Sequence, residues 1–546
     1  MESRSIRQWR RWAKGSSRLL VCIAAIAAVA AAGLSVVACG GGATTKGQSP
    51  SVLNLVNAWE YAGGGGWDPR AAGSNQVCYM ANMYETLVRI NPLGSAEPVA
   101  PLLATSWEVS KDSLVWTFHL RQGVKFQDGE PCNAAAVKYS IESTKKLNQG
   151  SAYILDAIKS VQVVDDLTVK FVLNNPAPLD RILAAEYAAY IFSPATKGKP
   201  TGWWAGKSFG TGPYEIASYT AGVSYTYKAF NDYWGGWNDS QYREVVVRVV
   251  PEALTQQQLL ESDQGEFAYQ VDADTVKSVP KSLTVVTSPT FYQFNIDLNT
   301  ARKPLDDVRV RQALAWALPY PDILTLGVNG MGSLSVGPIP ATLWPHDAAC
   351  PTYSYDVAKA KALLVEAGYP GGQGIHPLKL TYFSENTPAA NAAPLVKQAW
   401  EALGLKVQVQ PLLTSQLEAT ATGPAGQRQD AMIDRQWPSF PDGYDMLWYQ
   451  WHSQEPVGYN WSYWSSPETD KLMDDAFALE STDVQKAKAL YDQCQVLIVG
   501  QVPSIPLFDM SAVYLRTSNI ELGAGALNEN YPMVLFWDKV VPASGG

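Results

Sequence analysis

The feature that most constrains this chain is a single uncharged, apolar run near its N-terminus. Residues 19–38 contain no charged side chain, and the 18 residues before them hold six Arg or Lys residues. A basic segment followed by an apolar one is typical of a secretory signal, although a run of this length can also cross a membrane as a helix. No later stretch is apolar over 18 residues. We therefore expect the rest of the 546-residue chain to fold in water, outside the cytoplasm.

The end of the apolar run carries a processing motif. Val36-Val37-Ala38-Cys39 resembles the bacterial lipobox, in which the cysteine thiol is acylated before the peptide is cut ahead of it. The resemblance implies a lipoprotein signal peptide at residues 1–38 and a lipid on Cys39. Residues 39–51 are rich in Gly, Ser and Thr, as a flexible tether should be. The alternative is an uncleaved membrane anchor, and both interpretations place the body at the extracytoplasmic face of the cell membrane.

The composition is that of a globular protein, with 47% hydrophobic and 17% charged residues. The length predicts roughly three to four domain-sized units. The 42 Lys and Arg against 51 Asp and Glu residues give a net charge of −9, and six of the positive charges lie in the first 18 residues. Because the body is acidic, it lacks the basic surface that nucleic acid needs, and we expect no nucleic-acid partner.

Four cysteines lie in the expected body, namely Cys78, Cys132, Cys350 and Cys494. Outside the cell they could form two disulfides, in any of three pairings, or remain isolated buried thiols. Their spacing contains no C-x-x-C motif, so the sequence predicts no zinc site. The choice between disulfides and free thiols stays open at this point.

Strand and helix patterns alternate along the body. Strand patterns occupy residues 52–57, 114–121, 161–173 (two strands), 243–250, 291–298 and 405–411. Helix patterns occupy residues 78–88, a segment capped by Asn133 that ends near Ser143, 253–265, 306–318, 356–368, 391–403 and two helices within 468–499. This alternation predicts an α/β or α+β class.

Several short motifs, each occurring once, follow one another along residues 52–540. The most specific is Gly210-Thr211-Gly212-Pro213-Tyr214, supported by Tyr233-Trp234. The others are Tyr84–Val88, Pro101–Ala104, Ser106–Val109, Trp116–Arg121, Gly123–Gly129, Val310–Ala313, Ala362–Leu364, Glu366–Tyr369 and Ile505–Leu507. Together they resemble the bacterial family-5 extracellular solute-binding proteins, which serve ABC importers for dipeptides, oligopeptides, nickel and some oligosaccharides.

The resemblance implies an α/β fold of two lobes that close like a clamp, the type II periplasmic-binding-protein fold with an extra inserted domain. The implied domains are a discontinuous domain I (52–84, 207–290 and 505–546), an inserted domain II (85–206) and a domain III (291–504). Two strands are expected to cross between the lobes near residues 287–293 and 501–508.

The function implied by the resemblance is a monomeric, lipid-anchored receptor without a cofactor. It would capture a peptide-like solute and deliver it to the permease and ATPase subunits of an ABC importer. One alternative is the same role for an oligosaccharide or another amine-free solute. A remote alternative is a secreted cell-wall hydrolase, but the sequence lacks G-x-S-x-G and H-E-x-x-H motifs, and its four histidines are scattered. We therefore expect no enzyme activity and no bound metal.

The strongest candidate for a ligand site is the segment 437–464, which holds ten aromatic residues in 28 positions. Its Pro and Gly residues predict loops, and loops often carry binding residues. Trp437 matches the Trp that precedes cleft-lining residues in the family. The aromatic residues beyond about Tyr449 are expected to pack in the core.

The residues after Trp437 depart from the peptide-binding members of the family. Those members place an Asp three residues after this Trp, where it pairs with the peptide ammonium, but this chain has Phe440. A one-residue deletion would align Phe440-Pro441-Asp442 with the aromatic-Pro-Asp of the family. Ser439 is then the nearest polar group, and Asp442 could replace the missing Asp only if the loop is rearranged. This departure favours blocked, modified or cyclic peptides, or sugars, over free-amine peptides.

The remaining candidates lie beside the first strand or the first hinge crossing, and are Trp59, Tyr61, Tyr292 and Asn295. Four arginines could pair with a ligand carboxylate, namely Arg302, Arg309, Arg311 and Arg435. Of these, Arg309 and Arg311 are expected on a solvated helix face.

Overall fold

The computed structural model describes residues 52–58, 66–72, 77–92, 95, 98–269, 271 and 275–543, all of which belong to one folded unit, Ser49–Gly546. The expected signal peptide, the tether with Cys39, and the candidates Trp59 and Tyr61 lie outside these residues. No helix within the described ranges is both long and apolar enough to cross a membrane.

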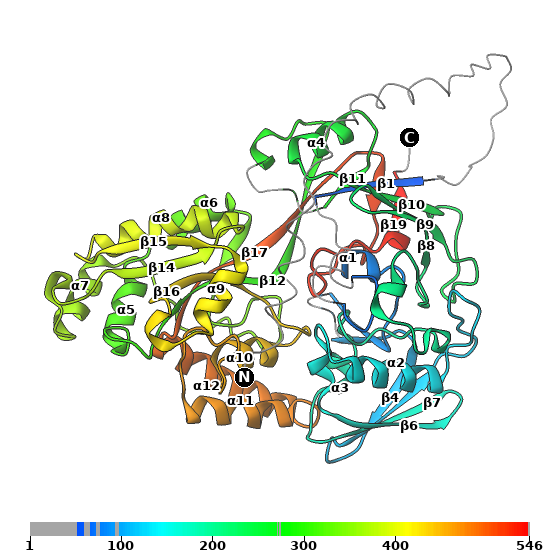
Figure 1. The fold of residues 1–546 in the computed structure, drawn as a ribbon, viewed down its shortest axis with the longest axis horizontal. Helices are drawn as coiled ribbons and strands as arrows, with labels where there is room; N and C mark the ends of the chain where they lie inside the picture. The colour runs from blue at the N-terminus through cyan, green and yellow to red at the C-terminus, as the bar shows by residue number, and fades with distance from the viewer. Residues whose placement is uncertain are drawn as a thin grey trace, which may run out of the picture. The chain divides into compact units, whose positions relative to one another are not determined.

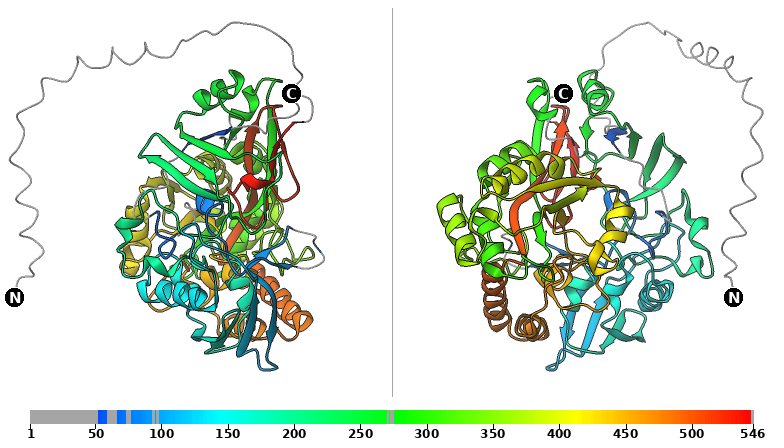
Figure 2. Two further views of the ribbon diagram at one scale, coloured as in Figure 1. Left: turned by 90° about the vertical axis from the view of Figure 1, so that its right-hand side faces the viewer. Right: turned by 60° about the vertical axis from the view of Figure 1, so that its left-hand side comes forward.

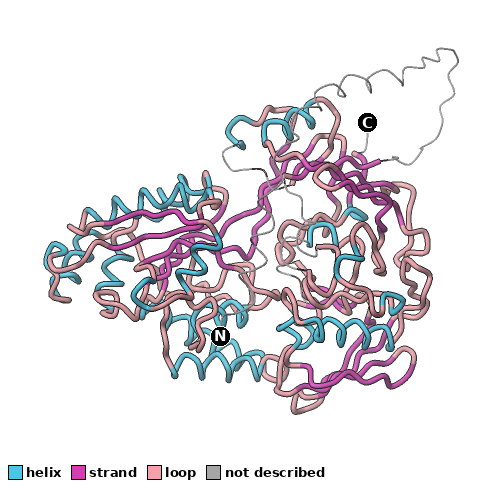
Figure 3. Tube along the Cα trace, in the orientation of Figure 1, coloured by secondary structure: helices cyan, strands magenta, loops and turns pink. Residues whose placement is uncertain are grey.

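One large mixed sheet of eleven strands runs through the unit, in the order β15-β14-β16-β12-β17-β11-β1-β10-β9-β8, with β13 paired to β17 (Figures 1 and 3). Its strands are β1 (Val52–Asn57), β8 (Tyr214–Thr220), β9 (Ser224–Ala229), β10 (Glu244–Val249), β11 (Phe267–Ala268), β12 (Thr284–Leu298), β13 (Gly332–Leu334), β14 (Leu378–Phe383), β15 (Val407–Leu412), β16 (Ala431–Gln436) and β17 (Ser504–Arg516).

The two longest strands of this sheet connect its two ends. β12 and β17 are 15 and 13 residues long and pair antiparallel, from Thr284 opposite Arg516 to Asp297 opposite Ser504. One end of the pair bonds to β11, and the other end bonds to β16. We call the strands from β11 to β8, the segment inserted between β1 and β8, and the residues after β17, which pack on both, the first lobe. Strands β14 to β16 and helices α5 to α12 form the second lobe.

The inserted segment of the first lobe contains a four-stranded antiparallel sheet, β4-β5-β7-β6. Its elements are β4 (Ala104–Val109), β5 (Val115–Leu120), α2 (Ala134–Leu147), β6 (Ile158–Asp165), β7 (Thr168–Leu173) and α3 (Leu179–Ile182). The predicted cap of α2 is present, because the Asn133 side chain accepts a hydrogen bond of 3.0 Å from Ala136 N. The predicted strand alternation at 114–121 is also confirmed, since Trp116, Phe118 and Leu120 are buried.

Helices cover one face of the second-lobe sheet (Figure 1). They are α5 (Val308–Trp316), α6 (Tyr320–Val328), α7 (Val357–Glu366) and α8 (Thr387–Glu401). Their apolar residues share one core with the strands, for example Val310 and Val396 with Leu380 and Ile433. The predicted helices at 306–318, 356–368 and 391–403 are therefore confirmed, with bounds that differ by one to four residues.

The remaining elements complete the two lobes. The other helices are α1 (Val77–Met80), α4 (Ala253–Glu261), α9 (Thr414–Ala421), α10 (Gly443–Trp451), α11 (Pro467–Leu479) and α12 (Val484–Gln501). Two small antiparallel sheets are formed by β2 (Val88–Ile90) with β3 (Val99–Pro101) and by β18 (Ile520–Leu522) with β19 (Val540–Pro542). Short 3-10 helices lie at Ala152–Leu155, Pro194–Thr196, Thr201–Trp204, Thr275–Ser278, Pro370–Gly372, Ala425–Gln427 and Trp537–Lys539.

Two element predictions are wrong. The helix predicted at 78–88 ends at Met80, because Glu85 forms an antiparallel bridge with Ile191 and Val88 begins β2. Tertiary pairing overrides the local helix pattern here. The segment 437–464 is also more regular than expected, because Asp442 and Gly443 start the nine-residue helix α10 instead of continuing a loop.

One prediction about a side chain is also corrected, and one open alternative is resolved. Arg311 does not lie on a solvated face, because it is 3% exposed and donates hydrogen bonds to the main-chain oxygens of Gln501, Val502 and Leu305. The four cysteines of the body form no disulfide and are all buried, so the isolated-thiol alternative holds.

Candidate ligand-binding site

The structure brings three of the sequence candidates together at the end of the β12–β16 pair. The last paired residues are Gln293 and Gln436, so Tyr292, within β12, and Trp437, the first residue after β16, lie next to the end of this pairing. Their ring centroids lie 6.1 Å apart, with the rings nearly perpendicular. Arg435 lies over both rings, 4.7 Å from the Tyr292 centroid and 5.2 Å from that of Trp437. Trp437 is 36% exposed, which leaves part of its indole free for contact with another molecule.

Arg435 keeps its charge available in this group. Within the described part of the chain it forms no ion pair, and its buried Nε has no hydrogen-bond partner. Cation–π contacts with two rings orient the guanidinium without neutralising it. Arg435 is thus the arginine candidate whose arrangement suits an anionic group. By contrast, Arg302 pairs with Asp430 and Arg309 with Asp307.

Ser439 and Phe440 lie where the second lobe meets the first. The Ser439 hydroxyl forms a hydrogen bond with the Tyr153 hydroxyl from the inserted segment. Phe440 is 4% exposed and packs in the apolar core of that segment. The two lobes are therefore in direct contact at these residues, as in a closed clamp.

Asp442 forms an ion pair across this contact between the lobes. It is fully buried, its Oδ1 accepts a hydrogen bond of 2.7 Å from Tyr444 N at the start of α10, and its Oδ2 pairs with Arg181 of α3 at 2.5 Å. Arg181 also contacts Glu480 at 3.1 Å and lies 4.1 Å from the centroid of the Trp344 ring. The carboxylate of Asp442 therefore has its partners within the protein. Figure 2 shows the neighbourhood of α11 and α12 from two further sides.

Asn295 is also engaged within the protein. It is fully buried on β12, and its Nδ2 donates a hydrogen bond of 3.0 Å to Gln450 Oε1 on α10. Its side chain fixes α10 against the sheet, whereas Trp437 and Tyr292 extend beyond the last strand pair.

A small cavity of about 10 Å³ lies between the lobes, close to Phe440. Its walls are Val77, Glu186, Tyr187, Phe291, Phe440, Pro441, Asn530, Tyr531 and Pro532. Sequence reasoning found Phe440 but missed Glu186. The available signal was one charged residue inside an otherwise apolar stretch, since residues 182–192 read ILAAEYAAYIF. Burial raises the pKa of Glu186 to about 7.

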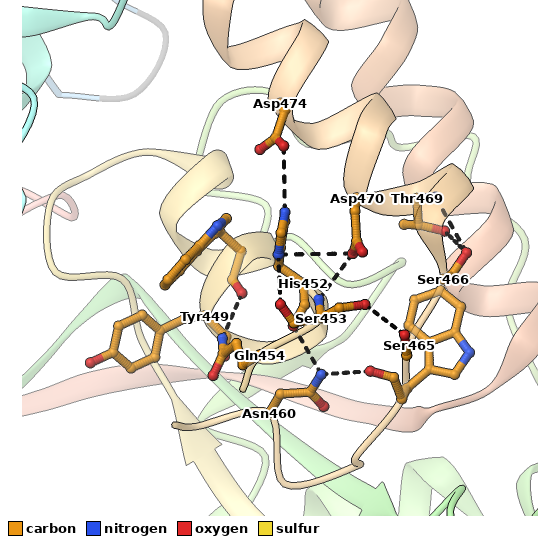
Figure 4. Close-up of polar contacts among 12 residues, drawn as sticks. Tyr449, His452, Ser453, Gln454, Asn460, Ser465, Ser466, Thr469, Asp470 and Asp474 are labelled. Carbon is orange, nitrogen blue, oxygen red and sulfur yellow. Dashed lines mark hydrogen bonds and ion pairs between the residues drawn. The ribbon is translucent and has the colours of Figure 1, made fainter. Parts of the chain in front are cut away.

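The later part of the aromatic segment is fixed by polar contacts (Figure 4). The His452 ring lies 3.5 Å from Asp474 and 3.9 Å from Asp470 of α11. Asn460 Nδ2 donates to the main-chain oxygens of His452 and Trp464, at 3.0 and 2.8 Å. Trp451, Trp461 and Trp464 are buried. Among the residues the structure describes, no cluster of three or more His, Cys, Asp or Glu could hold a metal ion.

Comparisons with known proteins identify the family. Residues 98–458 match the family described as bacterial extracellular solute-binding proteins, family 5. The chain belongs to this family. Family-5 members are extracytoplasmic binding proteins of ABC importers, so the resemblance and the two-lobe α/β fold expected from the sequence are both confirmed.

The family-5 relatives include proteins named for peptide ligands. The chain is 29% identical over 475 residues to the dipeptide-binding protein of Escherichia coli, an alignment that covers 81% of this chain and 86% of that one. It is 29% identical over 421 residues to the glutathione-binding protein GsiB of Pectobacterium atrosepticum, covering 74% and 79% of the two chains.

Solved structures have the same fold. DppA from Helicobacter pylori in complex with the peptide STSA superimposes with a TM-score of 0.73 at 24% identity, covering 90% of this chain and 98% of that chain. NikA from Brucella suis in complex with Fe(III)-EDTA gives a TM-score of 0.79 at 21% identity, covering 90% and 100%. The fold therefore accommodates chemically different ligands.

Proposed function

We propose that this family-5 protein is a lipid-anchored, monomeric receptor at the extracytoplasmic face of the membrane. It captures a peptide-like solute and delivers it to the permease and ATPase subunits of an ABC importer. The observation that carries the ligand class is the group formed by Trp437, Tyr292 and Arg435 beside the contact between the lobes. An aromatic platform with an unpaired guanidinium suits a solute that carries apolar groups and a carboxylate.

Closure of the lobes provides the signal in this function. A solute bound between the lobes touches both of them only in the closed state, so it shifts the equilibrium toward closure by its difference in affinity. The importer can then recognise closure as occupancy. A lipid on Cys39 would keep the receptor near the importer, although a single chain anchors only modestly.

The domain assignment follows the strands. We assign 52–84, 207–290 and 505–546 to domain I, 85–206 to domain II and 291–504 to domain III. This assignment is supported by the four-stranded sheet, all of which falls within 85–206, and by β14 to β16, which fall within 291–504. β12 and β17 are the hinge strands in this scheme.

A second candidate function is the same role for an oligosaccharide or another amine-free solute. It is favoured by Phe440 in place of an acidic residue and by the internal pairing of Asp442 with Arg181. The partly exposed Trp437 indole could stack on a sugar ring as well as on an apolar side chain.

A thermal-shift panel tests both candidates. The mature protein is heated with short peptides, with N-acetylated peptides and with malto- or cello-oligosaccharides. A true ligand at 100 times its dissociation constant stabilises the protein by about 2.7 kcal/mol. Trp437→Ala should reduce the binding free energy of that ligand by about 1–3 kcal/mol while the protein stays folded. A response to sugars and to none of the peptides would overturn the peptide proposal in favour of the second candidate.

A further inference from the structure

Glu186 is a buried carboxylate whose pairing is incomplete. The residue is 3% exposed, and its Oε2 has no hydrogen-bond partner among the described residues. The ion pair between its Oε1 and Arg89 Nη2 spans 3.9 Å, which is too long for a hydrogen bond. A buried charge without close partners is costly, so such a group in a folded protein calls for a specific explanation.

Arg89 does not complete the pairing of Glu186, because it is shared. Its guanidinium lies 4.3 Å from the centroid of the Phe536 ring and interacts with both Glu85 and Glu186. Glu85 shows what a satisfied carboxylate looks like in the same region. It accepts hydrogen bonds from Thr211 at 2.8 Å, from Trp234 at 2.7 Å and from Tyr233 at 3.1 Å. Within the described ranges, Glu186 has no comparable set of hydrogen-bond donors.

The cavity beside Glu186 has walls that favour a cation. Four of its nine lining residues are aromatic, namely Tyr187, Phe291, Phe440 and Tyr531. Aromatic ring faces attract cations, and the attraction is strongest where water is excluded. The Tyr531 hydroxyl is already used, because it donates to Ala184 O and accepts from Ile90 N. The volume of the cavity, about 10 Å³, is enough for one water molecule, and an ammonium group is of similar size.

We propose that Glu186 and these four aromatic residues form a subsite for a primary ammonium group of the captured solute. The lining comes from both lobes, since Phe440 and Pro441 belong to the second lobe and Glu186, Tyr187 and Tyr531 to the first. An ammonium ion held there would bond to the carboxylate of one lobe and to a ring of the other, so that it favours closure. The subsite rests on the proposed receptor function and narrows its ligands to amine-bearing solutes.

The experiment compares two libraries on the intact mature protein by calorimetry, a tripeptide library with free N-termini and the same library N-acetylated. We expect the unaltered protein to bind the free-amine library at least tenfold more tightly. Glu186→Gln should lose at least tenfold in affinity for the free-amine library and bind the acetylated one as before. Glu142→Gln, at an exposed glutamate of α2, is the matched control and should leave both affinities unchanged.

Each outcome separates the subsite from the general function. Equal binding of both libraries by the unaltered protein overturns the subsite alone, and this comparison needs no variant that might fail to fold. A full free-amine preference in folded Glu186→Gln also overturns it, and the cavity then holds only water. Binding of neither library overturns the proposed function and the subsite together.

Discussion

Two buried carboxylates lie on the contact between the lobes, and they differ in how they are paired. Asp442 caps α10 and forms an ion pair of 2.5 Å with Arg181 across the contact. Among the residues the structure describes, one oxygen of Glu186 has no hydrogen bond, and the other has only a 3.9 Å contact with Arg89. The comparison teaches that burial alone does not define a binding residue. A carboxylate that is fully paired holds the protein together, whereas one left open has capacity for a ligand.

The paired region is a small network around Arg181. Its guanidinium contacts Asp442 and Glu480, both fully buried, and lies over the ring of Trp344. Tyr491 donates a further hydrogen bond to Glu480. Arg181 comes from the first lobe and the other members from the second. The network therefore stabilises the closed arrangement, and both acids depend on one cation.

The largest expected effect comes from removing that cation. Arg181→Met keeps much of the side-chain volume but leaves Asp442 and Glu480 buried without their partner, which should lower the free energy of unfolding by about 3–5 kcal/mol. Urea denaturation measures this change. Lys125→Met is the control, because it removes an ion pair with Asp232 whose side chains are 52% and 59% exposed, and should cost at most about 1 kcal/mol.

The lobes could instead separate to rehydrate the two acids in Arg181→Met. Small-angle scattering would then show a larger radius of gyration, and urea denaturation would show a smaller decrease in the free energy of unfolding. If neither stability nor dimensions differed from those of the Lys125→Met protein, Arg181 would hold no important contact between the lobes.

The sequence predicted those elements whose pattern is decided locally. Asn133 caps α2, and β5 alternates between half-buried and buried residues, because both features depend on neighbours within a few positions. The helix predicted at 78–88 failed because Glu85 is fixed by partners more than 100 residues away. Arg311 was misplaced for the same reason, since it donates to the carbonyls of Gln501 and Val502 at the C-terminal end of α12, about 190 residues away.

The candidate site shows the same division. Tyr292 and Trp437 were singled out by their places beside a hinge strand and after a family Trp position, and the strand register brings them together. In the sequence, Glu186 is marked only as one charged residue in an apolar stretch, and that signal does not reveal that its Oε2 lacks a hydrogen-bond donor among the described residues. The lack of a hydrogen-bond donor near a carboxylate is a property of the folded contact and leaves no pattern in the sequence.

An intermediate effect is expected from pH. Burial raises the pKa of Glu186, Asp434 and Asp445 to about 7 each, so the folded protein takes up protons as the pH falls from 8 while the unfolded chain does not. The free energy of unfolding should therefore increase as the pH falls from 8 to 5.5, by about 2 kcal/mol for one such group. This increase ends near pH 4, because the pKa of the same carboxyl in the unfolded chain is about 4.

Urea denaturation at four pH values between 8 and 5.5 measures this dependence. Glu186→Gln and Asp445→Asn should each flatten the curve, since each removes one titrating group. A bound amine-bearing peptide should flatten it as well, because it stabilises the charged form of Glu186. A stability that falls steadily over this range in the unaltered protein would show that these acids are ionised and well paired, and the contrast with Asp442 would disappear.

The smallest effect concerns a neutral link on the same contact, the hydrogen bond between Tyr153 and Ser439. Tyr153→Phe keeps the ring, which lies 5.9 Å from that of Tyr449, and Ser439→Ala keeps the main chain whose N–H donates to Asp445. A double-mutant cycle should give a coupling of about 0.5–1.5 kcal/mol, well below the Arg181 effect. Because this bond lies outside the proposed Glu186 subsite, its loss should weaken the binding of free-amine and acetylated peptides equally. A selective loss for one library would mean that Ser439 contacts the solute directly, and the binding region would then extend from Glu186 to Ser439.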